Sequence, residues 1–406
     1  MNSNSYFNSK SLGATLIVAG TAIGAGMLAL PIATAAIGFW PALALMVGLW
    51  ALSGYSALLM LEVNLKVGAQ LDTHANLHTM TGHVLGRAGQ WVGALANLAL
   101  LYSLTAAYLS GGASLLMLKL GDWLALSHGS AALLFALTLG AVVALGMGYI
   151  DRMIRLLFSA KLLALLAVLV VLLPDTSALN LLADATEAVQ GQGALIAAIP
   201  VIITSFGFHV CIPSLVRYLQ GDVISLRRAL LIGSALPLLC YSLWLLATLG
   251  VLSPAEQLAL AQGDALANLV VSLSERSGQS WLGTALTAFA DLALLTSFLG
   301  VTLSLFDYLA ELSRRNDSAA GRGQTWLLTF LLPLGLAIFY PQGFVAILGF
   351  AAIPLMVYMV ILPVLMARKL RTQGVAGYQV RGGTPALALI TAAALGVIAA
   401  QLVTAL

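Results

Sequence analysis

Residues 18–31 decide the fold, and they read Val18-Ala19-Gly20-Thr21-Ala22-Ile23-Gly24-Ala25-Gly26-Met27-Leu28-Ala29-Leu30-Pro31. Three glycines fall within seven residues of this apolar run, and glycine weakens an α-helix. A second run has a similar polar centre between two prolines, and it reads Pro200-Val201-Ile202-Ile203-Thr204-Ser205-Phe206-Gly207-Phe208-His209-Val210-Cys211-Ile212-Pro213. Non-helical backbone inside a bilayer survives only where protein or a watery cavity satisfies its polar groups. We therefore expect two helices broken at mid-membrane beside a shared cavity.

The composition points to a membrane protein. The chain has 406 residues, of which 61% are hydrophobic and 8% are charged, with a mean hydropathy of +1.00. A soluble domain carries about 25% charged residues, so these numbers exclude a cytosolic enzyme, a disordered chain and a nucleic-acid binder. We predict an all-α polytopic membrane protein embedded in the lipid bilayer.

Eleven apolar segments are long enough for crossing helices, since a helix needs about 20 residues to span the hydrocarbon core. They cover residues 12–35, 37–62, 88–118, 131–149, 153–173, 193–219, 228–251, 281–311, 326–340, 342–367 and 385–405. The first five (12–173) and the next five (193–367) form two halves, and each half begins with a broken helix. An odd number of spans forces the second half to enter from the opposite side, which predicts an inverted repeat. Residues 385–405 add an eleventh span, and residues 1–11 form a cytoplasmic tail.

The placement of basic residues predicts the orientation. With a cytoplasmic N-terminus, 15 of the 18 basic residues lie in cytoplasmic segments, and only Lys119 and Arg276 lie outside. Excess Lys and Arg on the cytoplasmic side is the rule for such proteins, so we predict N-terminus in and C-terminus out, toward the periplasm. The fifteen are Lys10, Lys66, Arg87, Arg152, Arg155, Arg217, Arg227, Arg228, Arg314, Arg315, Arg322, Arg368, Lys369, Arg371 and Arg381.

Three segments resemble signatures of the bacterial aromatic amino acid permeases: residues 20–31, 204–209 and 297–308. The resemblance runs essentially end to end. It implies a LeuT-type fold within the amino acid–polyamine–organocation superfamily, and an inner-membrane importer driven by the proton-motive force. Residues 104–108, 158–161 and 376–383 resemble the tyrosine-transporting members. Tyrosine is then the expected substrate, with phenylalanine or tryptophan weaker, and tryptophan or a broader aromatic range remains an alternative.

The two breaks can bind a zwitterion without any charged side chain. Free N–H groups near Gly24, Ala25 and Gly26 lie at the positive end of a half-helix and suit a carboxylate. Carbonyl groups freed at residues 19–21 and 204–206 suit an ammonium group. The predicted substrate-binding residues are Gly20, Thr21, Ile23, Gly24, Ala25, Gly26, Tyr102, Thr105, Ala106, Thr204, Ser205, Phe206, Gly207, Phe208 and His209.

An aromatic side chain needs an apolar pocket with a few polar groups for a phenol. Phe206 and Phe208 lie at the depth where they could line or gate that pocket. Tyr102, Thr105, Ala106 and Tyr108 could form the opposite wall. His209 could meet the substrate hydroxyl, carry a proton, or be a hydrogen-bonded structural residue.

Lys161 is the basic residue that falls inside a predicted span. An ionisable group at that depth needs a partner or water, although a lysine can also extend to the interface. In some proton-coupled members of the superfamily, a fifth-span lysine replaces the sodium ion between spans one and eight. By this resemblance, we expect Lys161 to bind carbonyls near Gly20 and Ile23, close to Thr296 and Ser297.

Other classes of function fit less well. Sodium coupling on the same fold is the nearest alternative, but a cation at Lys161 would repel Na⁺. Asp291 could be a second protonation site or a gate residue. We predict no enzyme, no cofactor and no metal site, because Cys211 and Cys240 lie in different spans and His209 is the only histidine in a span. The oligomeric state is left open.

Overall fold

The structure, a computed structural model, describes residues 9–72, 75–144, 147–182, 191–260, 262–276, 280–313 and 318–405. Every regular element in these ranges is a helix. Most of the predicted N-terminal tail lies outside the described residues, as do Arg314 and Arg315. The same holds for the side chains of Arg152 and Arg155.

Both predicted helix breaks are present. Helix α1 (Ser9–Ala22) and helix α2 (Gly26–Thr34) meet at an angle of 52° across residues 23–25. Helix α8 (Gly191–Ser205) ends before an irregular stretch at residues 206–208. The chain then resumes as a short 3₁₀ turn, η3 (His209–Cys211), and helix α9 (Ile212–Tyr218). Glycine-rich and proline-flanked sequence therefore interrupts the helices where the local composition predicts.

Helices occupy all the remaining predicted spans, although α3 and α4 extend well beyond residues 37–62 and 88–118. They are α3 (Phe39–Leu71), α4 (Leu77–Leu124), α5 (His128–Ala144), α6 (Met147–Leu172), α10 (Val223–Val251), α13 (Ser280–Leu312), α14 (Ala319–Phe339), α15 (Phe344–Phe350), α16 (Ala352–Met356), a π turn (Val357–Ile361), α17 (Leu362–Thr372) and α18 (Gly383–Ala405). In the described ranges, nine helical segments are long and apolar enough to cross a membrane, or ten with the bent pair α1–α2. Helix α5 is apolar but shorter, at 17 residues. A count of eleven spans stays a prediction.

Helix α4 contains a local change of direction at Gly86. Its φ of 74° lies in the left-handed region, which glycine enters without the steric penalty of a side chain. Residues 77–85 therefore form a separate helical piece. The predicted span at 88–118 begins just after this point.

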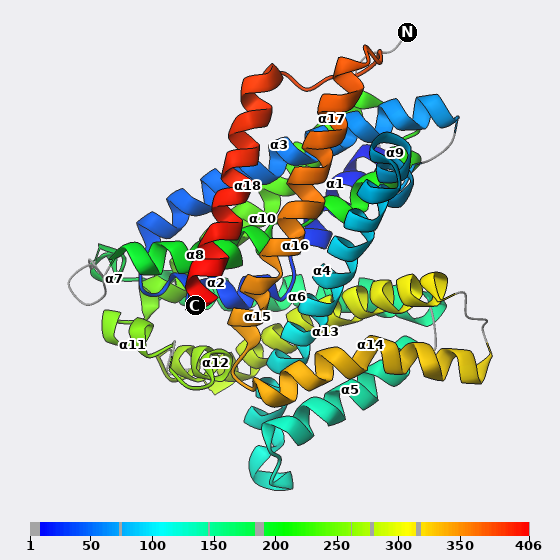
Figure 1. The fold of residues 1–406 in the computed structure, drawn as a ribbon. Coiled ribbons are helices and arrows are strands. Elements are labelled where there is room, and N and C mark those ends of the chain that lie inside the picture. Colours follow the sequence, from blue (N-terminus) through cyan, green and yellow to red (C-terminus); the bar gives the residue numbers. More distant parts are fainter. Residues whose placement is uncertain are drawn as a thin grey trace.

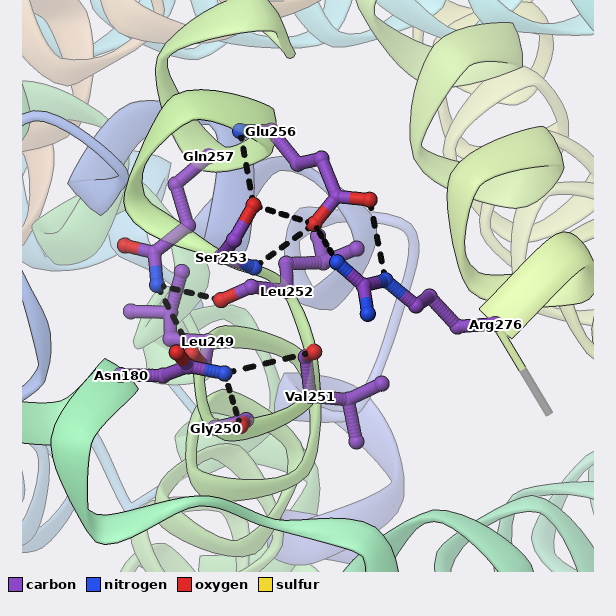
Figure 2. A network of polar contacts seen from close by, with 9 residues as sticks. All are labelled: Asn180, Leu249, Gly250, Val251, Leu252, Ser253, Glu256, Gln257 and Arg276. Atoms are coloured by element: carbon purple, nitrogen blue, oxygen red, sulfur yellow. Dashed lines mark hydrogen bonds and ion pairs between the residues drawn. The ribbon is translucent and has the colours of Figure 1, made fainter.

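Four short elements lie outside the long helices: η1 (Leu173–Asp175), α7 (Ala178–Leu182), α11 (Pro254–Ala259) and α12 (Ala265–Arg276). Figure 2 shows how α7 and α11 are held to the end of α10. The Asn180 amide donates to the Gly250 and Val251 carbonyls (2.9 and 3.4 Å), and the Gln257 amide donates to Leu249 and Leu252 (2.8 and 3.0 Å). These side chains satisfy carbonyls that a helix end leaves free.

Helix α11 begins with a capping box, in which Ser253 and Glu256 satisfy each other's backbone N–H groups. Arg276 at the end of α12 donates two hydrogen bonds to the Glu256 carboxylate, at 3.0 and 2.6 Å. Helix α12 also buries Leu266, Leu269 and Leu273 in the main core. The polar stretch between spans seven and eight is therefore a packed helical cap.

The breaks lie among packed helices. Helix α1 packs on α10, α2 packs on α8, and both α4 and α6 pack on α13. One apolar core surrounds α2, α8, α10 and α13, and a second surrounds α1, α3, α9 and α17. In Figure 1, α17 and α18 meet at one end of the molecule, and the C-terminus lies at the other end of α18.

A buried ionic cluster holds α3 to α17. Glu62 is fully buried and accepts two hydrogen bonds from Arg371 (2.8 and 2.5 Å) and one each from Lys66 (3.1 Å) and the Val380 N–H (2.9 Å). A buried charge of this kind is tolerated because it is paired and hydrogen-bonded. The cluster joins the second span to the segment between α17 and α18.

Candidate functional site

The two helix breaks are brought together by a close approach of α2 to α8. A Cβ on Gly26 would lie 2.7 Å from the Ser205 hydroxyl oxygen and 3.3 Å from the Ser205 Cα. Real Cβ atoms essentially never lie as close as the first of these distances, so glycine at position 26 lets α2 begin beside Ser205 without any shift of the Ser205 side chain. Gly26 therefore serves the packing of the two interrupted helices as well as the break itself.

Side chains from other helices meet the backbone groups at the breaks. The Tyr241 hydroxyl, from α10, lies 2.6 Å from the Ala22 carbonyl oxygen and 2.9 Å from that of Ser205. These are the last residues of α1 and α8. Ser53 of α3 donates to the Phe206 carbonyl at 2.9 Å. One hydroxyl group thus spans the C-terminal ends of both half-helices.

An N–H group in the first break also has a side-chain partner. Ala25 donates to the Ser297 hydroxyl oxygen at 2.8 Å. Gly24 makes this possible, because a Cβ at that position would lie 2.6 Å from the same oxygen. Helix α13 therefore contacts the N-terminal side of α2 through a hydroxyl group.

Lys161 of α6 is only 1% exposed. Its ammonium nitrogen donates to the Ile23 carbonyl at 2.7 Å and to the Thr296 hydroxyl at 3.1 Å. It also lies 4.6 Å from the centre of the Phe158 ring, which packs against Gly20. The side chain is thus directed to the break and to α13 rather than to the interface. Its part in coupling is a prediction taken up below.

Lys161 meets Ile23, one of the two carbonyls expected for it, but the carbonyls expected for an ammonium group in the first break differ. The Ala19 carbonyl stays in its helix and accepts the Ile23 N–H at 2.9 Å, so Ala22 and Ile23 supply the free oxygens. The Thr21 hydroxyl donates to Ile17 (2.7 Å) and the Thr204 hydroxyl to Pro200 (2.8 Å), each within its own helix. These free carbonyls lie inside the predicted break at residues 20–26 but after the carbonyls expected at residues 19–21.

The predicted aromatic residues separate into two groups. Phe206 is fully buried and contacts the Tyr241 ring edge-on, with centroids 5.4 Å apart. Phe208 instead stacks on His209 at 4.9 Å. The His209 Nε2 atom lies 2.8 Å from the Ser56 hydroxyl of α3. Phe206 thus belongs to the region between the breaks, whereas His209 connects α3 to the segment after the second break.

Residues of α4 also differ in their positions. Thr105 and Ala106 are fully buried, and the Thr105 hydroxyl donates to Leu101 of its own helix at 2.8 Å. The Tyr102 hydroxyl donates to the Leu328 carbonyl of α14 at 2.8 Å. The structure therefore buries Tyr108 in the same core as Ile23 and Phe206 and directs Tyr102 to a neighbouring helix.

A family model matches nearly the whole chain. Residues 8–401 match the model of the tryptophan/tyrosine permease family. The chain belongs to this family. The resemblance found in the sequence is thereby confirmed.

The relatives of this permease are close over nearly their whole length. It is 40% identical to tyrosine-specific transport system 2 of Haemophilus influenzae, over 96% of this chain and 95% of the relative. It is 37% identical to the tryptophan-specific transport protein of Pseudomonas aeruginosa, over 93% and 91%. The crystal structure of a single-residue mutant of the Eremococcus coleocola manganese transporter has a similar fold, with a TM-score of 0.58, 16% identity and coverage of 100% and 95%. That likeness concerns the fold alone.

Asp291 of the permease lies on another face of α13 from Thr296 and Ser297. It forms an ion pair with Lys119 of α4. The two line a cavity of about 170 Å³ together with Phe135 and leucines of α4 and α13. Its predicted role as a gate or protonation site is untested, and the ion pair gives it a structural partner.

Tyr241 and Ser53 are the contacts at the breaks that the sequence alone did not single out. Each is a polar residue inside an apolar span, and a buried Tyr hydroxyl usually finds a hydrogen-bond partner. That signal could have marked Tyr241 as a candidate. In the described part of the permease, no group of three or more His, Cys, Asp or Glu residues could hold a metal ion.

Proposed function

We propose that this permease imports an aromatic amino acid, L-tyrosine first, across the bacterial inner membrane by proton-coupled alternating access. Relatives at 40% identity are named for tyrosine and one at 37% for tryptophan, so tryptophan is the second candidate. The observation that carries the proposal is the meeting of two interrupted helices, one buried lysine and several hydroxyl groups at one place.

The packing supports a LeuT-type 5+5 inverted repeat. Each helix of the first half (α1–α6) can be matched with one of the second half (α8–α17), and the contacts between helices then correspond. The packing of α1 on α10 corresponds to that of α8 and α9 on α3, and α6 on α13 corresponds to α15–α17 on α4. We propose eleven spans, with α5 as the fourth and α18 outside the repeat, and a cytoplasmic N-terminus with a periplasmic C-terminus.

The breaks supply complementary groups for a zwitterion. The N-terminus of α2, with the Ala25 N–H, favours the substrate carboxylate. The C-terminal ends of α1 and α8 offer the Ala22 and Ser205 carbonyls, which favour an ammonium group. The surrounding Phe206 and Tyr108 are mostly buried and can pack against an aromatic ring. A low-dielectric site of this kind strengthens each of these contacts.

Lys161 can couple the proton to the movement of α1 and α2. Hydrogen bonds from a charged donor are roughly twice as strong as neutral ones, so the protonated side chain holds the Ile23 carbonyl and Thr296 together. Release of the proton weakens this link between α6, the first break and α13. A sodium ion at the same place would meet the charge of Lys161, which argues for protons over sodium.

The proposal is tested by uptake of radiolabelled L-tyrosine into proteoliposomes, with an inward proton gradient and no sodium. We expect accumulation that a protonophore abolishes and that unlabelled tyrosine inhibits better than phenylalanine, tryptophan or leucine. Lys161→Met should abolish accumulation while binding of L-tyrosine persists. Lys369→Met, at an exposed position on α17, is the matched control and should accumulate normally.

Each other outcome has a defined meaning. Unimpaired proton-coupled accumulation in Lys161→Met would refute the lysine mechanism. Uptake that requires sodium would refute proton coupling and leave the fold unaffected. Uptake of tryptophan without tyrosine would move the substrate to the second candidate.

A further inference from the structure

The backbone groups proposed to hold the charged ends of the substrate already have partners within the protein. The Tyr241 hydroxyl lies on the Ala22 and Ser205 carbonyls, where the ammonium group is expected. The Ser297 hydroxyl oxygen accepts the Ala25 N–H, where the carboxylate is expected. Two neutral hydroxyl groups therefore lie at the two positions that suit a zwitterion.

The Tyr241 contact has the geometry of an ammonium site but lacks donors. A hydroxyl group has one proton and can donate fully to only one of two carbonyls, yet its oxygen lies 2.6 and 2.9 Å from both. An ammonium group has three donors and could serve both oxygens at once. Because charged donors make stronger hydrogen bonds than neutral ones, an ammonium group would be the better occupant.

The Ser297 hydroxyl lies where a carboxylate would be the better hydrogen-bond acceptor. Its hydroxyl oxygen accepts from Ala25 at 2.8 Å, and it donates to the Ala293 carbonyl of its own helix at 2.9 Å. A carboxylate would accept from the same N–H with a full charge. When a carboxylate displaces Ser297, it becomes the new partner of the Ala25 N–H, so this backbone group is not left unpaired.

We propose that Tyr241 and Ser297 are place-holders, whose hydroxyl groups occupy the ammonium and carboxylate positions of the empty permease and are displaced by the substrate. The inference rests on the proposed transport of an aromatic amino acid. Its physical reason is that a buried carbonyl or N–H group without a partner destabilises the protein. A transporter must cross between its two conformations without substrate, and the hydroxyl groups satisfy the breaks during that return.

The test measures which end of the ligand each hydroxyl competes with. Full-length protein in lipid nanodiscs is titrated with L-tyrosine, with tyramine (no carboxylate), and with 3-(4-hydroxyphenyl)propanoate (no ammonium group). Wild type, Tyr241→Phe and Ser297→Ala are compared. Tyr241→Phe keeps the ring contact with Phe206 and removes only the hydroxyl group.

In Tyr241→Phe, the ammonium group no longer displaces a hydroxyl. We expect the ratio of Kd for the propanoate to Kd for tyrosine to rise by roughly fivefold to tenfold, the effect of about one neutral hydrogen bond. The ratio of Kd for tyramine to Kd for tyrosine should stay the same. Ser297→Ala should show the reverse pattern, so each variant controls for the other.

If the ratio expected to rise stays unchanged in each variant, the inference is overturned. If that ratio falls, the hydroxyl binds the ligand directly, which also overturns the inference. If wild type binds neither L-tyrosine nor L-tryptophan, the proposed function fails, and the inference fails with it. Should Tyr241→Phe not fold, 3-fluorotyrosine at position 241 gives a second readout by ¹⁹F NMR. Its resonance should shift with L-tyrosine and with tyramine but not with the propanoate, and a missing shift with tyramine would refute the place-holder role.

Discussion

Gly24 allows the sharpest prediction about the first break. A Cβ at this position would lie 2.6 Å from the Ser297 hydroxyl oxygen and 3.7 Å from the Ser297 Cβ. The backbone of Gly24 is not in the left-handed region, so alanine is sterically allowed by its own main chain. In Gly24→Ala, the hydroxyl of Ser297 must therefore move away from the Ala25 N–H.

The cost follows from these distances. Moving the Ser297 hydroxyl relieves the overlap, because the nearest other atoms lie at 3.7 Å or more. The movement breaks the Ala25–Ser297 hydrogen bond and leaves the Ala25 N–H unpaired, so we expect Gly24→Ala to lower the free energy of unfolding by about 1–3 kcal/mol. Thermal unfolding of the protein in nanodiscs, followed by intrinsic fluorescence, measures the effect.

A second substitution should relieve the first. In Ser297→Ala the clashing oxygen is absent, and the nearest remaining side-chain atom of residue 297 would lie at an ordinary 3.7 Å. Gly24→Ala should then cost almost nothing on the Ser297→Ala background. Gly300→Ala, on the same helix as Ser297 with no heavy atom within 4 Å of the added Cβ, is the control and should not destabilise. An equal loss of stability on both backgrounds would refute this account.

Two further predictions concern the ionic contacts. Glu62→Ala leaves Arg371 and Lys66 without their buried carboxylate, so we expect the free energy of unfolding to fall by about 3–5 kcal/mol. Thermal unfolding measures this loss. A loss below about 1 kcal/mol, the range of exposed ion pairs, would contradict the prediction. Hydrogen bonding from Arg276 lowers the pKa of the Glu256 carboxyl from its ordinary 4.5 to about 2. This contact therefore stabilises the folded protein above pH 4.5, and its contribution is lost as the pH falls toward 2. Arg276→Gln should therefore reduce the difference in melting temperature between pH 6 and pH 3, and an unchanged difference would show that the pair does not contribute.

Much of the architecture could be predicted because it depends on local properties. Apolar length determines where a helix can cross a bilayer, and glycine and proline determine where it is interrupted. For this reason the predicted breaks near residues 20–26 and 204–209 match the ends of α1 and α8. The predicted spans end at residue 62 and resume at residue 88, but α3 continues to Leu71 and α4 begins at Leu77.

That difference has a tertiary cause. Glu62 and Lys66 look like residues of an interface when each is considered alone. In the folded protein, Arg371 approaches from α17, more than 300 residues away, and completes the buried cluster. Paired charges can be buried where single charges cannot, so the helix continues through a segment that hydropathy alone would end.

The sequence by itself determined the membrane class, the approximate spans, the two breaks and Lys161 as a buried basic candidate. The family resemblance already placed Lys161 near Ile23 and Thr296, and the structure has both contacts. Only the tertiary structure decided that the Tyr241 hydroxyl lies across the Ala22 and Ser205 carbonyls. The physical reason is that hydrophobic length and helix propensity are carried by neighbouring residues. A hydrogen bond between two helices depends on which helices are in contact and on their relative position along their axes. Packing over the whole chain determines both.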